Sequence, residues 1–111
     1  MIKVQEYCID KIKPGLMPKE LADDAQKYLK NLTKRGFYLI TGHHIGLECE
    51  EAHMFGPISS MDIPFERNMV LDIEVWLNVR GQGLVGIEDC YRITDTGCER
   101  LSSLDKSIVV K

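Results

Sequence analysis

Two apolar segments of the sequence, residues 69–79 and 84–94, carry acidic side chains. These acids are Asp72, Glu74, Glu88 and Asp89. Glutamate is uncommon in β-strands, and acids are rarely buried without a partner. Two carboxylates held close together repel each other unless a cation, a shared proton or water offsets the repulsion. The acids therefore indicate either a solvated sheet face or a site for a hard cation with oxygen ligands fixed by strands.

A histidine close to these acids would add a nitrogen ligand to such a site. His43 and His44 lie in the stretch TGHHIGLECEE, at the end of an apolar run. An imidazole ligand favours Mn, Co, Zn or Fe over Ca. His43 is the candidate ligand, whereas His44 is interpreted as a loop residue exposed to water.

The acids are expected on a β-hairpin. In segment 69–79 the apolar side chains alternate onto one face, and the acids take the other. The second face comprises Val70, Asp72, Glu74 and Trp76. Trp76 either lines a substrate pocket or forms a wall of the core. The stretch NVRGQG predicts a glycine-containing turn, after which residues 84–94 return as the second strand.

Other elements are predicted around this hairpin. Residues 37–41 are expected as a short strand, residues 42–64 mostly as loop, residues 98–101 as another strand and the tail SIVVK as a last one. Two helices are expected first, over residues 1–12 and from Pro18, with Gly36 as the stop of the second. The fold class is thus α+β: two N-terminal helices packed on a mainly antiparallel sheet, with residues 1–111 as one domain.

Composition excludes several classes of partner. The 111 residues carry a net charge of -3, and Lys27, Lys30, Lys34 and Arg35 are interpreted as a solvated helix face rather than a nucleic-acid footprint. No apolar run approaches the roughly 20 residues that span a bilayer, so no membrane partner is expected. Charges interrupt the N-terminal stretch, which predicts a cytoplasmic protein without a secretory signal. The four cysteines form no CxxC pair and are expected as free thiols.

Four stretches resemble motifs of one family, in the family's order. GHHIGLECEE resembles GHGIGLEVHE, NMVLDIEVWL resembles GMVFTIEPGI, GLVGIEDCYRITDTGCERLS resembles GGVRIEDTVLVTEDGCEVLT, and IKPGLMPKELADDAQKYL resembles IKPGMTEKELA. On these motifs the chain resembles the pita-bread metallopeptidases, which are the Xaa-Pro aminopeptidases, prolidases and methionine aminopeptidases, with creatinase as a relative. The resemblance covers nearly the whole chain but only the C-terminal half of the family's catalytic domain.

The resemblance implies a dinuclear metal centre. In the family two aspartates, one histidine and two glutamates bind two divalent metals, and the matching positions here are His43, Glu74 and Glu88. The metals activate a water that attacks the scissile amide. The aspartates belong to the N-terminal half, so binding of Mn, Co or Zn is expected to require that half, and the chain alone is expected to be inactive.

The motifs also depart from the family at named positions. Glu50 aligns with a family histidine that helps to bind substrate and stabilise the intermediate, and it is retained as the candidate catalytic position. An acid does not replace a neutral donor at pH 7 without a large pKa shift. Val75 stands for a proline, Gly86 for an arginine and Cys90 for a threonine.

Three hypotheses follow from this resemblance. The chain is the C-terminal part of a metal-dependent hydrolase acting on Xaa-Pro peptides or a small C–N substrate, with an N-terminal half-domain as partner. Alternatively, it is a non-catalytic pita-bread-like module that binds peptides or proteins. Because an isolated half would expose the sheet surface that normally meets its mate, a homodimer is also expected.

Overall fold

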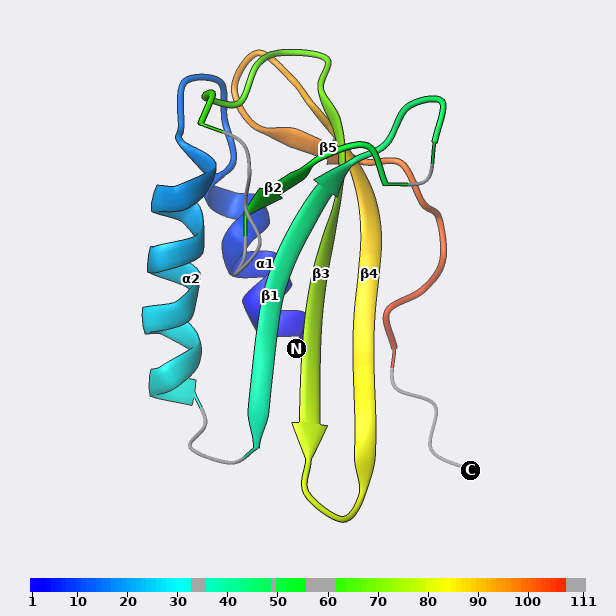
Figure 1. The fold of residues 1–111 in the computed structure, drawn as a ribbon. Helices are drawn as coiled ribbons and strands as arrows, with labels where there is room; N and C mark the ends of the chain where they lie inside the picture. Colours follow the sequence, from blue (N-terminus) through cyan, green and yellow to red (C-terminus); the bar gives the residue numbers. More distant parts are fainter. Residues whose placement is uncertain (33–35, 49, 56–61, 108–111) are drawn as a thin grey trace.

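The structure is a computed structural model that describes residues 1–32, 36–48, 50–55 and 62–107. Its elements in chain order are α1 (Ile2–Lys11), α2 (Pro18–Leu32), β1 (Phe37–His44), β2 (His53–Phe55), β3 (Val70–Val79), β4 (Gly83–Ile93) and β5 (Cys98–Arg100). The strands form one sheet in the order β2-β1-β3-β4-β5, and every neighbouring pair is antiparallel (Figure 1).

The sequence prediction is confirmed in its main elements, and it is wrong about where the first strand ends. The strand that starts at Phe37 runs three residues beyond Thr41, because His44 still pairs with Leu71 of β3. The segment expected mostly as loop also contains β2, a strand of three residues that pairs with β1 and was not predicted. The strand predicted for the tail SIVVK falls largely on residues 108–111, outside the described part of the chain.

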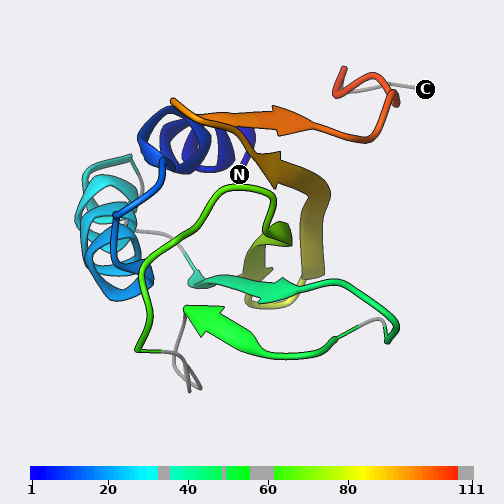
Figure 2. The ribbon, with the colours of Figure 1, turned by 90° about the horizontal axis from the view of Figure 1, so that it is seen from above.

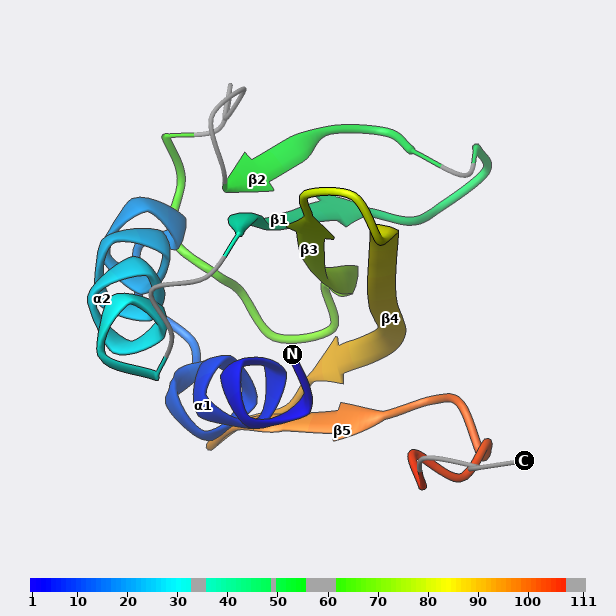
Figure 3. The same cartoon turned by 90° about the horizontal axis from the view of Figure 1, so that it is seen from below.

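Both helices lie on one side of the curved sheet (Figures 2 and 3). The side chains of β3 that point to the helices are Leu71, Ile73 and Val75, all buried, as the alternation predicts. They pack against buried residues of α1 and α2, namely Val4, Cys8, Leu21, Ala25 and Leu29. The hydrophobic core therefore lies between the helices and one face of the sheet.

The opposite face of the sheet carries the polar positions of β3. Register pairs Glu74 with Thr41 of β1 and with Glu88 of β4, and it pairs Asp72 with His43 and Cys90. No helix of the described residues packs on this face. The β3–β4 turn is tight because Gly81 and Gly83 adopt φ values of +79° and +123°, which residues other than glycine rarely adopt.

Buried polar contacts fix α1 on the sheet. The Gln5 amide donates to the carbonyl of Ile73 over 2.9 Å, and Lys106 donates to the Gln5 side-chain oxygen over 2.6 Å. Cys8, Cys90 and Cys98 are free thiols, as expected, whereas Cys49 lies outside the described residues.

Candidate metal centre

Three adjacent strands each contribute one side chain to a cluster on the helix-free face. His43 comes from β1, Glu74 from the central strand β3 and Glu88 from β4. Antiparallel pairing places side chains that share a register position on the same face, so Glu74 and Glu88 point the same way. The sheet therefore gathers residues that lie 31 and 14 positions apart in the chain.

The cluster is compact. The His43 Nε2 lies 3.3 Å from Glu74 Oε1 and 3.4 Å from Glu88 Oε1. One ligand atom from each residue falls within 4.8 Å of the others. The exposed fraction of the side chain rises from 4% for His43 through 13% for Glu74 to 45% for Glu88, so the cluster opens to solvent on its Glu88 side.

The second ring nitrogen of His43 faces a backbone acceptor. His43 Nδ1 lies 3.2 Å from the carbonyl oxygen of His44. A proton on Nδ1 donated to this carbonyl leaves a lone pair on Nε2, directed at the two carboxylates. This is the arrangement in which metal-binding histidines are commonly held.

The electrostatics of the cluster suit a positive charge. Burial opposes the charged imidazole, but the carbonyl of His44 and the carboxylates of Glu74, Asp72 and Glu88 outweigh it and raise the pKa of His43. Burial, followed by the charges of Glu74 and Asp72, raises the pKa of Glu88. Without a cation, the site thus disfavours the ionised form of Glu88.

The donor set also fits a divalent transition metal. One imidazole nitrogen and two carboxylates match the ligands preferred by Mn, Co and Zn. Asp72 lies on the same face, beside His43 in register, and its Oδ1 is buried without a hydrogen-bond partner in the described part of the chain. A buried carboxylate oxygen without a donor is costly, and a nearby cation would offset that cost.

Two other candidates from the sequence lie elsewhere. Glu50 is exposed in the segment between β1 and β2 and is not one of the three clustered residues. Asp89 points to the opposite face, where its carboxylate accepts hydrogen bonds from Arg100 over 2.7 Å and from Ser102 over 2.6 Å.

The interpretation of His44 as an exposed loop residue is wrong, because it ends β1 half-buried, with Nδ1 3.3 Å from the carbonyl oxygen of Val70.

One contact of the cluster was not anticipated from the sequence. The indole Nε1 of Trp76 donates a hydrogen bond to Glu74 Oε2 over 2.6 Å. Trp76 follows Glu74 by two residues in β3, so strand periodicity places both side chains on one face. That periodicity was the available signal, but it does not specify the indole orientation.

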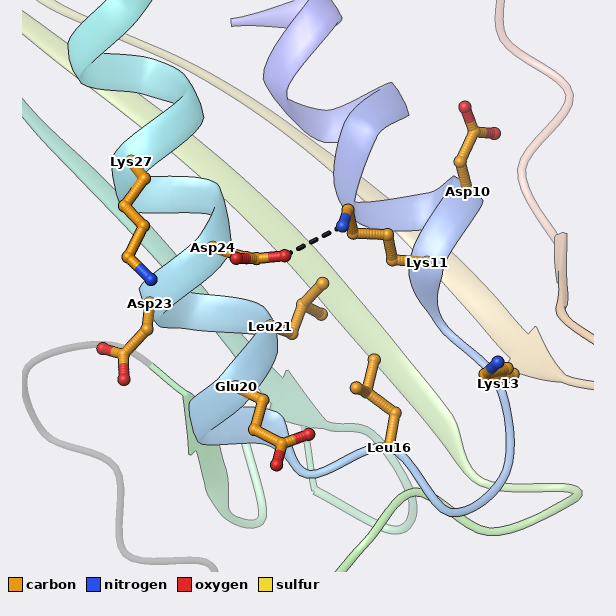
Figure 4. Close-up of a pocket in the computed structure, with 9 residues that line it drawn as sticks. All are labelled: Asp10, Lys11, Lys13, Leu16, Glu20, Leu21, Asp23, Asp24 and Lys27. Atoms are coloured by element: carbon orange, nitrogen blue, oxygen red, sulfur yellow. Dashed lines mark hydrogen bonds and ion pairs between the residues drawn. The ribbon is translucent and has the colours of Figure 1, made fainter.

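A pocket lies away from the cluster, between α1 and α2 (Figure 4). Its volume is about 560 Å³, and it is lined by acidic and basic side chains together with Leu16 and Leu21. Lys11 Nζ and Asp24 Oδ2 form an ion pair of 2.8 Å across it. Its acids are thus partly neutralised by neighbouring lysines, unlike those of the cluster on the other side of the sheet.

The described helices include none that is both long enough and apolar enough to cross a membrane.

Comparison with known proteins supplies an independent line of evidence. The model of metallopeptidase family M24 matches residues 1–95. The Xaa-Pro dipeptidase of Pyrococcus furiosus is 29% identical, over 98% of this chain and 31% of its own length. The Xaa-Pro dipeptidase of Lactobacillus delbrueckii subsp. lactis is 33% identical, over 96% of this chain and 28% of its own. The chain thus spans about a third of the length of these curated relatives.

Solved structures agree with the sequence comparison. The X-Pro aminopeptidase of Thermotoga maritima superposes with a TM-score of 0.81 at 28% identity, covering 96% of this chain and 30% of that one. The prolidase of Pyrococcus furiosus gives a TM-score of 0.75 at 28% identity, covering 95% and 31%. These matches confirm the resemblance read from the four motifs and the predicted fold of two helices on an antiparallel sheet.

Proposed function

Because this chain belongs to metallopeptidase family M24, we propose that it supplies His43, Glu74 and Glu88 to the metal centre of an Xaa-Pro peptide hydrolase. The observation that supports this most directly is the convergence of one imidazole and two carboxylates, from three strands, within 4.8 Å. Three protein ligands of this kind suffice to hold a divalent transition metal and leave room for water or substrate.

Each side chain has a distinct part in this proposal. His43, held by the carbonyl of His44, offers Nε2, and Glu74 and Glu88 each offer an oxygen on the adjacent strands. A bound Mn, Co or Zn ion supplies Lewis-acid polarisation of a carbonyl and a water of lowered pKa. The protein residues orient that centre and keep it on the rigid part of the sheet.

The substrate and the remaining ligands are also part of the proposal. The relatives are named for Xaa-Pro dipeptidase or aminopeptidase activity, which favours a peptide with proline in second position. We propose that the two missing aspartate ligands come from an N-terminal half-domain, on a separate chain or in a longer protein. The chain described here is then inactive alone and binds a cation with only part of the ligand set.

Calorimetric titration of the chain with MnCl₂, CoCl₂ or ZnCl₂ tests the ligand assignment. We expect saturable binding that disappears in the double variant Glu74→Gln/Glu88→Gln. The matched control is Glu99→Gln, which changes an exposed acid of β5 paired with Arg92. Absence of binding in the unaltered chain, both alone and mixed with the N-terminal half-domain of a prolidase, would exclude the metal-centre proposal.

Complementation tests the proposed reaction. Mixing the chain and a divalent metal with such an N-terminal half-domain should yield hydrolysis of an Xaa-Pro dipeptide. The same mixture with the double variant should yield none. Equal hydrolysis in both mixtures would show that the activity belongs to the added half alone.

A second candidate function is that of a binding module without catalysis. It is favoured by Glu50, an acid at the position of the family histidine, and by exposed apolar side chains on the cluster face. Phe37 and Leu84 are 72% and 60% exposed and flank an apolar hollow of about 390 Å³ with Leu39 and Trp76. Peptide binding that is unchanged in Glu74→Gln/Glu88→Gln would favour this function over the hydrolase.

The same apolar surface motivates the proposal of a homodimer, since an uncovered patch on a sheet face favours association. Light scattering over a wide range of protein concentration tests it. A monomer mass at every concentration would exclude the homodimer.

A further inference from the structure

The hydrogen bond between Trp76 and Glu74 gives the two carboxylate oxygens of Glu74 different partners. Glu74 Oε2 accepts from the indole Nε1 over 2.6 Å, while Glu74 Oε1 lies 3.3 Å from His43 Nε2. One oxygen is therefore occupied by a neutral donor, and the other faces the cluster. Hydrogen bonds to carboxylate acceptors are typically short, and 2.6 Å is a short distance for an N–H donor.

The indole is fixed by its packing as well as by its hydrogen bond. Trp76 lies directly opposite Gly86 of β4 and Leu39 of β1 in the sheet register. A Cβ atom at Gly86 would stand 2.5 Å from Trp76 Cε3, so the six-membered ring lies against the glycine backbone. Any residue other than glycine at position 86 would therefore displace the ring of Trp76.

Trp76 and Gly86 differ in size from the residues at the same positions of the family motifs quoted above: the first is larger here and the second is smaller. GMVFTIEPGI has glycine where this chain has Trp76, and GGVRIEDTVL has arginine where it has Gly86. In the register of this chain the two positions are direct partners, so the motif residues would place the larger side chain on the other strand. The pair Trp76–Gly86 is thus a feature of this chain, in which a tryptophan supplies the donor next to Glu74.

We propose that Trp76 is a positioning residue for Glu74, which it holds with Oε1 turned to the cation site, and that its emission reports occupation of that site. This rests on the proposed function in one respect, namely that a divalent cation binds at His43, Glu74 and Glu88. Residues that orient metal ligands by hydrogen bonds typically contribute 10- to 100-fold to metal affinity. Trp76 is the single tryptophan of the chain, so its fluorescence is a signal from one place.

The test is a titration of the full chain with ZnCl₂, followed in parallel by calorimetry and by tryptophan fluorescence. Zinc is chosen because it is diamagnetic and does not quench emission by itself. We expect a change in emission that saturates with the dissociation constant found by calorimetry. Glu74→Gln should abolish this change together with the binding.

The variant Trp76→Phe separates positioning from packing, because phenylalanine keeps a ring against Gly86 but has no N–H donor. Its affinity for zinc should fall by about ten-fold. The control Leu84→Ala alters an exposed apolar residue of the same face and should keep the original affinity. Far-UV circular dichroism verifies that each variant is folded.

The outcomes distinguish this inference from the proposed function. Zinc binding by the unaltered chain without any change in emission, or equal affinity in folded Trp76→Phe, overturns the role of Trp76 and leaves the metal centre standing. No zinc binding by the unaltered chain, either alone or mixed with the N-terminal half-domain of a prolidase, overturns both. If Trp76→Phe fails to fold, zinc binding by the unaltered chain without a change in emission still overturns the role of Trp76.

Discussion

Glu74 and Glu88 are direct cross-strand partners in the β3–β4 hairpin, and His43 Nε2 lies within 3.4 Å of an oxygen of each. Like charges placed directly opposite each other destabilise an antiparallel pair. The imidazole beside them offsets part of this repulsion when it is protonated, which its raised pKa favours, and a divalent cation would offset more. This arrangement therefore lowers the stability of the cation-free chain and provides a preformed cation site.

Glu88→Gln should stabilise the cation-free chain at pH 7 while weakening cation binding. The pKa of Glu88 is raised in the folded chain. At pH values above that pKa the folded chain holds an ionised carboxylate in an unfavourable environment, which lowers its stability. A neutral side chain of the same shape avoids this cost. Because Glu88 is 45% exposed and screened by water, we expect a gain of less than about 1 kcal/mol in urea unfolding. Lower stability of Glu88→Gln than of the control Glu99→Gln would contradict this prediction.

Asp89→Asn should destabilise the chain, by about 2 kcal/mol, because it breaks a largely buried ionic network. The Asp89 side chain is 8% exposed and lies 3.0 Å from Lys106 Nζ, in addition to its bonds from Arg100 and Ser102. The control is Asp95→Asn, which changes an exposed pair with Arg67 and should have almost no effect. Equal unfolding free energies for both variants would show that the network contributes nothing.

The loss caused by Asp89→Asn should also depend on pH. Burial would raise the pKa of Asp89, but hydrogen bonds from Ser102, Lys106 and Arg100 outweigh it and lower the pKa. A lowered pKa in the folded state adds stability above the unfolded-state pKa of about 3.9, and that stability is lost as pH falls through the folded value. Urea unfolding at pH 7 and at successively lower pH should therefore show a shrinking difference between the two chains below about pH 4.

Gly86→Ala should cost roughly 1–3 kcal/mol of stability, because its Cβ would meet the Trp76 ring and force the indole or the strand to move. The nearest ring atom would be only 2.5 Å away. Gly97→Ala is the matched control, since the nearest atom to its Cβ would be 3.9 Å away and its φ is not positive. Thermal unfolding of both variants checks this, and a Gly86→Ala melting temperature equal to that of Gly97→Ala would rule out the tight ring contact.

Glu50→His should raise hydrolysis in the complemented two-half enzyme. The position aligns with a family histidine, and a neutral imidazole can donate at pH 7 whereas an ionised acid cannot. We expect a gain of roughly 10² in kcat/KM for an Xaa-Pro dipeptide, at the lower end of the range for a positioned proton donor. Glu50→Gln keeps the shape of the acid without an imidazole, and equal rates for the two variants would remove any role for a histidine there.

The sequence predicts the two faces of β3 well, because strict alternation over residues 69–79 leaves only one consistent assignment. Chain order and the turn at NVRGQG also predict the β3–β4 hairpin. Periodicity alone does not specify which residues face each other, because that depends on the exact turn length and on the φ values of Gly81 and Gly83. The opposition of Glu74 and Glu88 therefore required the structure.

Other parts of the site depend on contacts between distant segments. His43 reaches the acids because β1 pairs with β3 on the side opposite β4. Its place at the end of an apolar run and the family resemblance both pointed to it, but neither predicted this pairing. Strand β2 has three residues, too few for alternation to be detected. The network of Asp89 involves Ser102 and Lys106. These residues lie after the predicted strand of residues 98–101, in a segment without a periodic pattern. The cytoplasmic location and the homodimer stay predictions.

The separation of the two sheet faces has a consequence for how this chain can change over generations. The side chains that hold the fold together point to the helices, whereas His43, Glu74, Glu88 and Trp76 point away from them. Substitutions on the helix-free face alter charge and chemistry without opening a cavity in the core. A lineage can therefore gain, lose or exchange a chemical activity on this scaffold while its folding remains intact, so shared architecture and shared catalysis need not be inherited together.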